Sequence, residues 1–309
     1  MHKAQYAKAS ILNYDARPKV RKRTTAALRD LGFRRIANVD KPNDLCNLVK
    51  SQKFELVIFA ADTDGSPDAR LVKQARRYES ASDPYTPIIL VSWNSASEVI
   101  RRALNTGTDQ LLMWPFTTEQ LGERVDALIS SRKEFVETES YLGPDRRDAK
   151  VRSGSDGSVQ VPNALRAKVL DRPELGPSRD AIEVARVSLA RIKITNVCRR
   201  ICVIAKVLRQ HHGDEKFMRV RGPRELGAIE KSLSVIRKTL KVTELGHMHS
   251  FCDSVEQVTT QLLEDAPDLD KKGLSLLEQT TLALRVAMDV DEDTANAAFR
   301  LSDEVAKAV

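Results

Sequence analysis

A near-continuous apolar run in Glu55–Ala61 constrains the fold more than any other segment. A strand that is covered on both faces is apolar throughout, as in parallel sheets. Strands are also expected at Ser10–Asp15, Arg35–Val39, Pro87–Ser92 and Asp109–Met113. Helical patterns follow the strands at 18–32, 44–51, 68–79, 97–105 and 117–133. The alternation predicts an α/β fold, a doubly wound five-stranded parallel sheet with ligand sites at the strands' carboxyl ends.

Changes in composition indicate four parts of the chain. Residues 1–9 are expected to be an N-terminal tail, and residues 10–133 form the α/β domain. Residues 134–178 are polar and rich in Gly, Pro and Ser, which is typical of a linker in which short extended pieces can dock. Residues 179–309 have helical periodicity and predict an all-α bundle of four or five helices. Its first helix ends near His211-His212-Gly213, and the others are expected at 224–243, 248–265, 271–289 and 292–308. The breaks between them are Gly222-Pro223, Gly246, Pro267 and the acidic turn at 289–293.

Charge and hydropathy exclude several classes of protein. The chain has 309 residues and a formal charge of +7, with Lys and Arg scattered among acids. This distribution favours acidic partners slightly and is not typical of a nucleic-acid-binding protein. No apolar run is long enough to span a membrane, and residues 1–10 lack the apolar core of a signal peptide. The four cysteines form no Cys-x-x-Cys motif, which indicates free thiols, so we expect a cytoplasmic protein.

Several motifs at fixed places in this order carry a family resemblance. Ile11-Leu12-x-x-Asp15 precedes Pro18-x-x-Arg21, and Pro115-Phe116 follows the fifth expected strand. Residues 9–132 thereby resemble the receiver domain of two-component response regulators, which implies a flavodoxin-like fold. The segments 143–147 and 161–166 also resemble tails that follow some proteobacterial receivers.

The resemblance implies a phosphoryl site in which most functional groups are absent. Receivers use two acids after the first strand for Mg²⁺ and an aspartate at the end of the third strand as phosphoryl acceptor. They also use a Ser or Thr after the fourth strand and a Lys before the proline that follows the fifth. The corresponding positions here are Asp15, Ala16, Ala60, Ser92, Trp114 and Pro115. In addition, Leu111 stands where an aromatic switch residue is usual.

These departures predict that the receiver phosphorylation cycle does not run. The methyl group of Ala60 cannot form an acyl phosphate. Mg²⁺ requires several oxygen ligands, which Asp15 alone does not supply. Without Lys and Mg²⁺, little neutralises the transferred phosphoryl group. We therefore expect a degenerate pseudo-receiver with no catalytic residues, no cofactor and no metal, and thus no enzyme.

Two positions near this site leave alternatives open. Asp62 lies two residues beyond Ala60 and is an alternative phosphoacceptor, although the shift moves the carboxylate by over about 6 Å. The indole of Trp114 either fills the vacated acidic pocket or lies half-exposed in a loop, and Trp114-Pro115 should tolerate the cis bond usual in the family.

The other candidate site residues have structural explanations. His211 and His212 are expected to cap a helix. His247 and His249 are two residues apart near a helix start, and the surrounding sequence does not match a phosphotransfer helix. Cys198, Cys202 and Cys252 favour core packing over a metal site. The basic residues of the first helix (Lys19, Arg21, Lys22, Arg23 and Arg29) and of the first bundle helix (Arg191, Lys193, Arg199, Arg200 and Lys206) are expected to be solvated.

The leading functional hypothesis is a phosphorylation-independent signalling adaptor of a two-component system or phosphorelay. It would bind another response regulator or a histidine kinase, through the pseudo-receiver or the bundle. A homodimer formed along Val99–Ala103 and Leu121–Leu128 is a further expectation. The first alternative is a nucleic-acid-binding regulator, which is disfavoured because no basic helix-turn-helix and few stacking aromatics are present. The second alternative is an atypical phosphoacceptor that uses Asp62.

Overall fold

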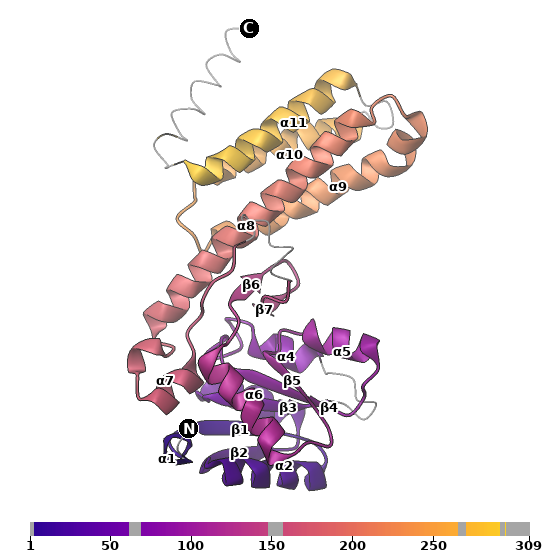
Figure 1. The fold of residues 1–309 in the computed structure, drawn as a ribbon. Helices are drawn as coiled ribbons and strands as arrows, with labels where there is room; N and C mark the ends of the chain where they lie inside the picture. Colours follow the sequence, from indigo (N-terminus) through magenta and orange to yellow (C-terminus); the bar gives the residue numbers. More distant parts are fainter. Residues whose placement is uncertain (1–2, 62–68, 148–156, 265–269, 291–293, 295–309) are drawn as a thin grey trace. The chain divides into compact units, whose positions relative to one another are not determined.

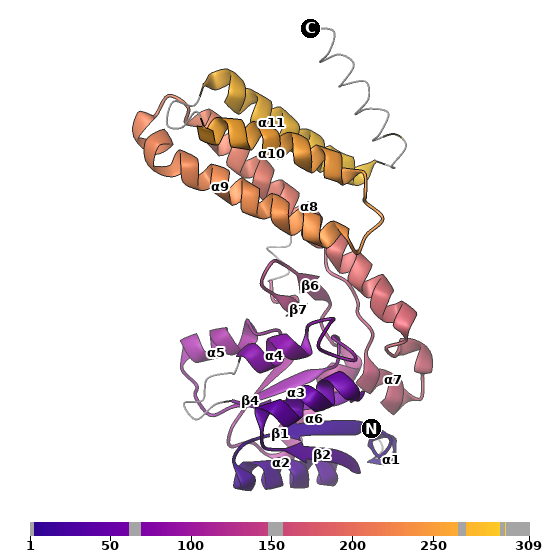
Figure 2. The same ribbon diagram turned by 180° about the vertical axis from the view of Figure 1, so that it is seen from behind.

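The computed structural model describes residues 3–61, 69–147, 157–264, 270–290 and 294. The chain divides into two compact units, Met1–Leu189 and Ala190–Val309. Helix α8 (Arg179–Gln210) runs through the boundary and contributes to both units. Figures 1 and 2 show the chain from opposite sides. Among the described residues, no helix is both long and apolar enough to cross a membrane.

The first unit contains the expected five-stranded parallel sheet, in the order β2-β1-β3-β4-β5. The strands are β1 (Ser10–Tyr14), β2 (Arg35–Val39), β3 (Leu56–Ala60), β4 (Ile88–Ser92) and β5 (Gln110–Met113). The intervening helices are α2 (Pro18–Leu31), α3 (Pro42–Ser51), α4 (Ala69–Ala75) and α5 (Ser97–Leu104), and α6 (Thr118–Ser130) follows β5. The doubly wound topology predicted from hydropathy is confirmed.

Alternate side chains of the strands pack against opposite helical layers. Ile58 and Ile89 lie in the cluster that includes residues of α2 and α6, whereas Val57 and Phe59 lie in the cluster that includes residues of α3 and α4. β3 is buried at every position. This burial on both faces explains why its sequence is apolar throughout.

The chain after α6 is not an open linker in the residues described. Strands β6 (Phe135–Glu137) and β7 (Leu142–Pro144) form an antiparallel pair, and Phe135 also bridges to Val159. Helix α7 (Ala164–Leu170) and the short helix η1 (Pro173–Leu175) follow. The short extended pieces expected within the linker at 134–178 are present as β6 and β7, whereas helix α7 was not expected. The segment is polar overall, and its few large apolar side chains act as anchors. A few such side chains are enough to fix so short a segment.

Those anchors pack on the sheet domain itself. Leu165 and Val169 of α7 lie in the same core cluster as α2 and α6, and Asn163 Nδ2 donates to the Leu128 carbonyl at 2.7 Å. Phe135 is fully buried in a separate cluster with Tyr85. Gly107, with φ 101°, allows the Leu142 carbonyl to approach its backbone closely. We refer to residues 134–176 as the annex.

The expected N-terminal tail is also partly folded. Helix α1 (Lys3–Tyr6) precedes β1. The Tyr6 ring packs on Phe33 at 4.8 Å between centroids, and its hydroxyl donates to Asp126 at 2.6 Å. The segment thus belongs to the sheet domain in its described residues.

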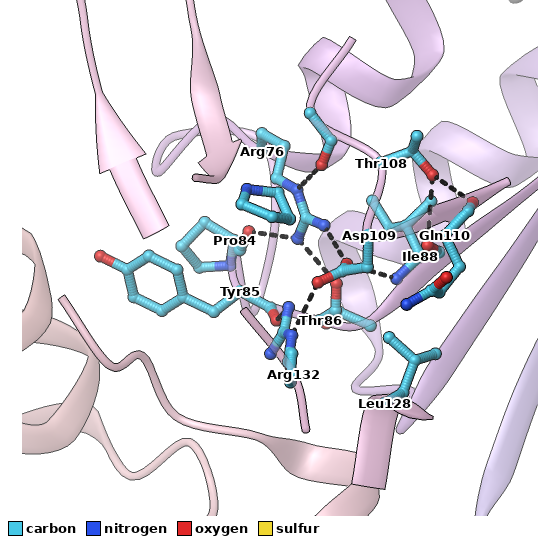
Figure 3. A network of polar contacts seen from close by, with 12 residues as sticks. Arg76, Pro84, Tyr85, Thr86, Ile88, Thr108, Asp109, Gln110, Leu128 and Arg132 are labelled. Atoms are coloured by element: carbon cyan, nitrogen blue, oxygen red, sulfur yellow. Dashed lines mark hydrogen bonds and ion pairs between the residues drawn. The ribbon is translucent and has the colours of Figure 1, made fainter. Parts of the chain in front are cut away.

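A buried network of charges joins β5 to the annex (Figure 3). Asp109 accepts from Arg76 at 2.6 Å and from Arg132 at 2.7 Å, and the side chains of all three are at most 6% exposed. The guanidinium of Arg132 also donates to the carbonyls of Tyr85 and Pro162. Because Pro162 belongs to the annex, the network fixes this segment to the sheet domain.

The second unit is a helical bundle in the residues described. It consists of α8, α9 (Glu215–Leu240), α10 (Met248–Glu264) and α11 (Lys271–Val286), with η2 (Ala287–Asp289) after α11. Their buried faces form one apolar cluster. The long first helix and the helices near 248 and 271 are confirmed, and the helix expected at 292–308 lies outside the described residues apart from residue 294.

The expected break at Gly222-Pro223 does not occur, because Pro223 lies inside α9. A proline removes one backbone hydrogen bond of a helix and clashes with the preceding turn. Here Pro223 is exposed, while Met218, Gly222 and Leu226 remain buried on the opposite face. Packing of that face keeps α9 continuous past the proline.

Candidate functional site

Four of the positions selected from the sequence come together at the carboxyl edge of the sheet. Asp15 directly follows β1, Ala60 ends β3, Ser92 ends β4, and Trp114 directly follows β5. The register pairs Ala60 with Val91 and Ser92 with Met113, so these strand ends are level. The Trp114 N–H donates to the Ser92 carbonyl at 2.7 Å. The arrangement is the one expected from the topology.

Asp15 is buried and held by an arginine two residues further along the chain. Arg17 Nε donates to Asp15 Oδ1 at 3.0 Å, and Arg17 Nη2 donates to Oδ2 at 2.9 Å. The Arg17 backbone N–H adds a bond to Oδ1 at 2.8 Å. Both carboxylate oxygens therefore have cationic donors. Paired bonds of this kind are among the strongest that side chains form.

Local sequence explains this geometry. Arg17 has an extended backbone (φ −91°, ψ 112°) as the N-cap of α2, and Pro18 begins the helix. An aspartate can accept from the backbone N–H two residues on in such a turn. Arg21, one turn into α2, donates to the Asp15 carbonyl at 2.5 Å. The backbone on either side of the carboxylate is thus fixed by α2.

Trp93 completes the enclosure of Asp15. It follows Ser92 at the end of β4, and the Arg17 guanidinium carbon lies 3.5 Å from the centroid of its ring. A stacked aromatic ring restricts the guanidinium to one plane and adds a cation–π attraction. We call Asp15, Arg17 and Trp93 the arginine clasp.

The phosphoacceptor position has no oxygen atom on its side chain. Ala60 is 6% exposed, and its methyl group is part of the packed end of β3. Ser92 is buried, and its Oγ accepts from the Asn94 N–H at 3.3 Å. Ala16, at the second acidic position, is exposed, and its methyl side chain has no oxygen atom that could bind a metal ion. Asp62, the alternative acceptor, lies outside the described residues.

Trp114 is half-buried, and its described contacts lie on the α2 side of the sheet. Its ring meets Phe116 edge-on at 5.3 Å between centroids, and the Arg23 guanidinium lies 5.7 Å from its centroid. The Trp114–Pro115 bond is cis. Arg17, rather than the indole of Trp114, covers the carboxylate of Asp15. Leu111, at the usual switch position, is half-buried in the core cluster on the α3 and α4 side.

Two of the histidines outside this edge, His211 and His247, have structural partners. His211 stacks on Phe217 at 4.4 Å between centroids, and its Nδ1 lies 3.0 Å from the Val207 carbonyl at the end of α8. His247 is buried with Nε2 at 3.0 Å from the Ala287 carbonyl. His212 and His249 are exposed.

The cysteines lie in apolar packing rather than in a ligand cluster. Cys198 and Cys252 are buried, whereas Cys46 and Cys202 are half-buried. Burial raises the pKa of the Cys252 thiol to about 12 and that of Cys198 further. No group of three potential metal ligands occurs in the described part of the chain.

The arginine clasp makes a stability prediction. Arg17→Ala should lower the free energy of unfolding by about 2 kcal/mol, because it leaves the buried Asp15 carboxylate without its charged donor. Urea unfolding followed by circular dichroism measures this value. Lys22→Ala on the exposed face of α2 is the control and should change it by about 0.5 kcal/mol or less. Equal effects of the two substitutions would contradict a structural role for the clasp.

Comparison with known proteins matches the sheet domain. Residues 11–126 match the family model of the response regulator receiver domain. Chemotaxis protein CheY-3 of Vibrio cholerae serotype O1 is 26% identical over 101 residues, which cover 33% of this chain and 76% of that protein.

Solved structures similar to the chain include two receivers. Chemotaxis protein CheY4 of Vibrio cholerae has 19% identity and a TM-score of 0.35, covering 39% of this chain and 98% of that one. The receiver domain of a sensor histidine kinase from Pseudomonas aeruginosa PAO1 has 20% identity and a TM-score of 0.34, covering 38% and 93%. That structure has a magnesium ion coordinated in its active site cleft.

Proposed function

Because residues 11–126 are a response-regulator receiver domain of the two-component, CheY-like class, we propose that this chain is a phosphorylation-independent signalling adaptor. It would act by binding proteins, not by catalysis. The proposal rests on two features of the carboxyl edge of the sheet. The acceptor position holds the methyl group of Ala60, and Arg17 occupies both oxygens of Asp15.

The arginine clasp supports phosphorylation independence on electrostatic grounds. Mg²⁺ binding at Asp15 would require the carboxylate to exchange a fixed guanidinium for a hydrated ion. Mg²⁺ gives up water reluctantly and needs several oxygen ligands. Neither Ala16 nor Ala60 supplies one. An internal, permanent cation thus takes the place of an exchangeable one, which favours a single constitutive conformation.

Receiver domains work with other signalling proteins, and we propose another response regulator or a histidine kinase as the partner. The α5–β5–α6 face is the first candidate surface. The homodimer contact expected along Val99–Ala103 and Leu121–Leu128 stays a proposal. Ile100 and Ala127 are half-buried. The other apolar side chains of the two ranges are buried: Val99, Ala103, Leu121, Val125 and Leu128. A contact there would have to use outward residues such as Arg101, Arg102 and Arg124.

Labelling with acetyl phosphate and Mg²⁺ tests the proposal. We expect intact-protein mass spectrometry of the wild type to show no added phosphoryl group. Asp62→Ala is measured in parallel. Incorporation in the wild type would refute phosphorylation independence, and its loss in Asp62→Ala would identify Asp62 as the acceptor.

A further inference from the structure

The outer face of α9 carries cations and small residues in a seven-residue pattern. Arg224, Lys231 and Lys238 are exposed and seven residues apart. Gly227 and Ser234 lie between them with the same spacing. We call these five residues the α9 ridge. The opposite face of α9 is buried in the bundle core and includes Leu226, Ile229, Leu233, Ile236 and Leu240.

The cations of the α9 ridge form no ion pair among the residues that the structure describes. In contrast, Arg237 on the same helix is paired with Asp253 and Glu256 of α10, at 2.6 and 2.7 Å. Residues 190–241 contain 14 Lys and Arg but four Asp and Glu. The local charge is therefore strongly positive and is not neutralised along the α9 ridge.

No contact within the described part of the chain explains why residue 227 is a glycine. A glycine in a helix interior is destabilising relative to alanine because it has more backbone freedom to lose. A Cβ built at Gly227 would meet no other atom within 4 Å, so packing does not require its absence. The missing side chain leaves a shallow place on the helix where another backbone can approach.

We propose that the α9 ridge docks an acidic α-helix of a protein partner. Carboxylates seven residues apart on that helix would lie about 10.5 Å apart, which matches the spacing of Arg224, Lys231 and Lys238. Gly227 and Ser234 would allow the partner's backbone to lie close to α9. This inference deepens the proposed adaptor function and rests on it for the role of protein binding.

The shape of the α9 ridge favours a helix over a nucleic acid. The α9 ridge has no aromatic side chain on which an unpaired base could stack. A phosphate backbone would give no reason for Gly227, whereas close packing of two helices does.

Synthetic helical peptides test the proposal on the 309-residue chain. One peptide carries Glu at seven-residue spacing along an Ala- and Gln-rich helix, and a second has the same composition in scrambled order. Binding is measured by fluorescence anisotropy. We expect the spaced peptide to bind at least about tenfold more tightly, a difference of about 1.4 kcal/mol. Equal affinities would overturn the proposal.

Three variants test the ridge cations, cations elsewhere on the bundle, and close packing at Gly227. Lys231→Glu/Lys238→Glu should weaken binding of the spaced peptide at least about tenfold, whereas Lys271→Glu/Lys272→Glu on α11 is the charge-matched control and should leave it within about twofold. Gly227→Gln should also weaken binding while raising the melting temperature, because glutamine is the better helix former. Unchanged binding in Gly227→Gln would remove the close-packing part of the proposal.

Duplex DNA and vesicles containing anionic lipid are the remaining probes. The proposal fails if either binds the α9 ridge as tightly as the spaced peptide and responds equally to Lys231→Glu/Lys238→Glu. Failure here differs from failure of the adaptor function. The peptide measurements do not involve Asp15 or Ala60, and acetyl phosphate labelling does not involve α9.

Discussion

Replacing Asp109 with asparagine is expected to lower the free energy of unfolding of the first unit by about 3 to 5 kcal/mol. The carboxylate lies between the guanidinium groups of Arg76 and Arg132, all buried (Figure 3). Asparagine keeps the shape but removes the carboxylate charge that both guanidinium groups contact. Breaking a buried pair from one side is costly for this reason. Urea unfolding at neutral pH measures the effect.

The contribution of Asp109 to the free energy of unfolding is expected to depend on pH. Burial alone would raise the pKa of Asp109, but the charges of Arg132 and Arg76 outweigh it and hold the pKa below its ordinary value. The stabilisation is therefore fully present above the unfolded pKa of about 3.9 and is lost as the pH falls below it. The difference between wild type and Asp109→Asn should be constant from about pH 5 to 8 and shrink below about pH 4.

Glu123→Gln is the control for this prediction. Glu123 is exposed on α6, so the neutral substitution should change the free energy of unfolding by about 0.5 kcal/mol or less. If Asp109→Asn were as mild, the buried network could not be what fixes the annex to the sheet domain.

Restoring the missing receiver groups is expected to restore Mg²⁺ binding, and to give tighter binding when Arg17 is also removed. The first variant is Ala16→Asp/Ala60→Asp/Trp114→Lys, and the second adds Arg17→Ala. Because the guanidinium of Arg17 competes for both oxygens of Asp15, the second variant should bind Mg²⁺ at least about tenfold more tightly. Equal Mg²⁺ affinities of the two variants would mean that Arg17 does not compete with Mg²⁺ for Asp15.

Tryptophan fluorescence measures Mg²⁺ binding to the restored variants directly. The chain has two tryptophans, so Trp93 is the only one left in either restored variant. Its ring contacts the Arg17 guanidinium in the structure. Displacement of Arg17 by Mg²⁺ in the first variant should therefore change the Trp93 emission. Asp15→Asn in the same background is the control and should abolish the Mg²⁺ response.

The sheet domain could be predicted from the sequence because its signals are local and strong. β3 is apolar at every residue, and Arg35–Val39 was predicted with the bounds that the structure has. Pro18 and Gly32 mark the start of α2 and the residue after its end, where φ is 117°. The sheet topology then follows from the alternation of strands and helices.

Other parts could not be predicted because their signals depend on tertiary contacts. The annex is polar and short of large apolar residues, and Phe135 is informative only because Tyr85 and the guanidiniums of Arg76 and Arg132 surround it. Pro223 predicted a break in α9, but core packing on the opposite side of the helix outweighs the lost hydrogen bond.

The arginine clasp was missed although its sequence signal is simple. Asp15-Ala16-Arg17 places an arginine two residues after an aspartate, immediately before a helix-starting proline. Asp145-Arg146-Arg147 has the same spacing and the same contacts, since Arg147 donates through its backbone N–H and its guanidinium to Asp145. Asp-x-Arg in a turn is thus a local pattern that holds a buried carboxylate. Trp93 has no comparable signal, because only the fold brings it to Arg17.

We expect the wild-type site to bind neither Mg²⁺ nor the phosphoryl group. Fluorine NMR of the 309-residue chain with Mg²⁺ and beryllofluoride, a mimic of the acyl phosphate, measures both at once. We predict the signals of free beryllofluoride only, with and without Mg²⁺. A bound signal that requires Mg²⁺ and disappears in Asp15→Asn would refute phosphorylation independence.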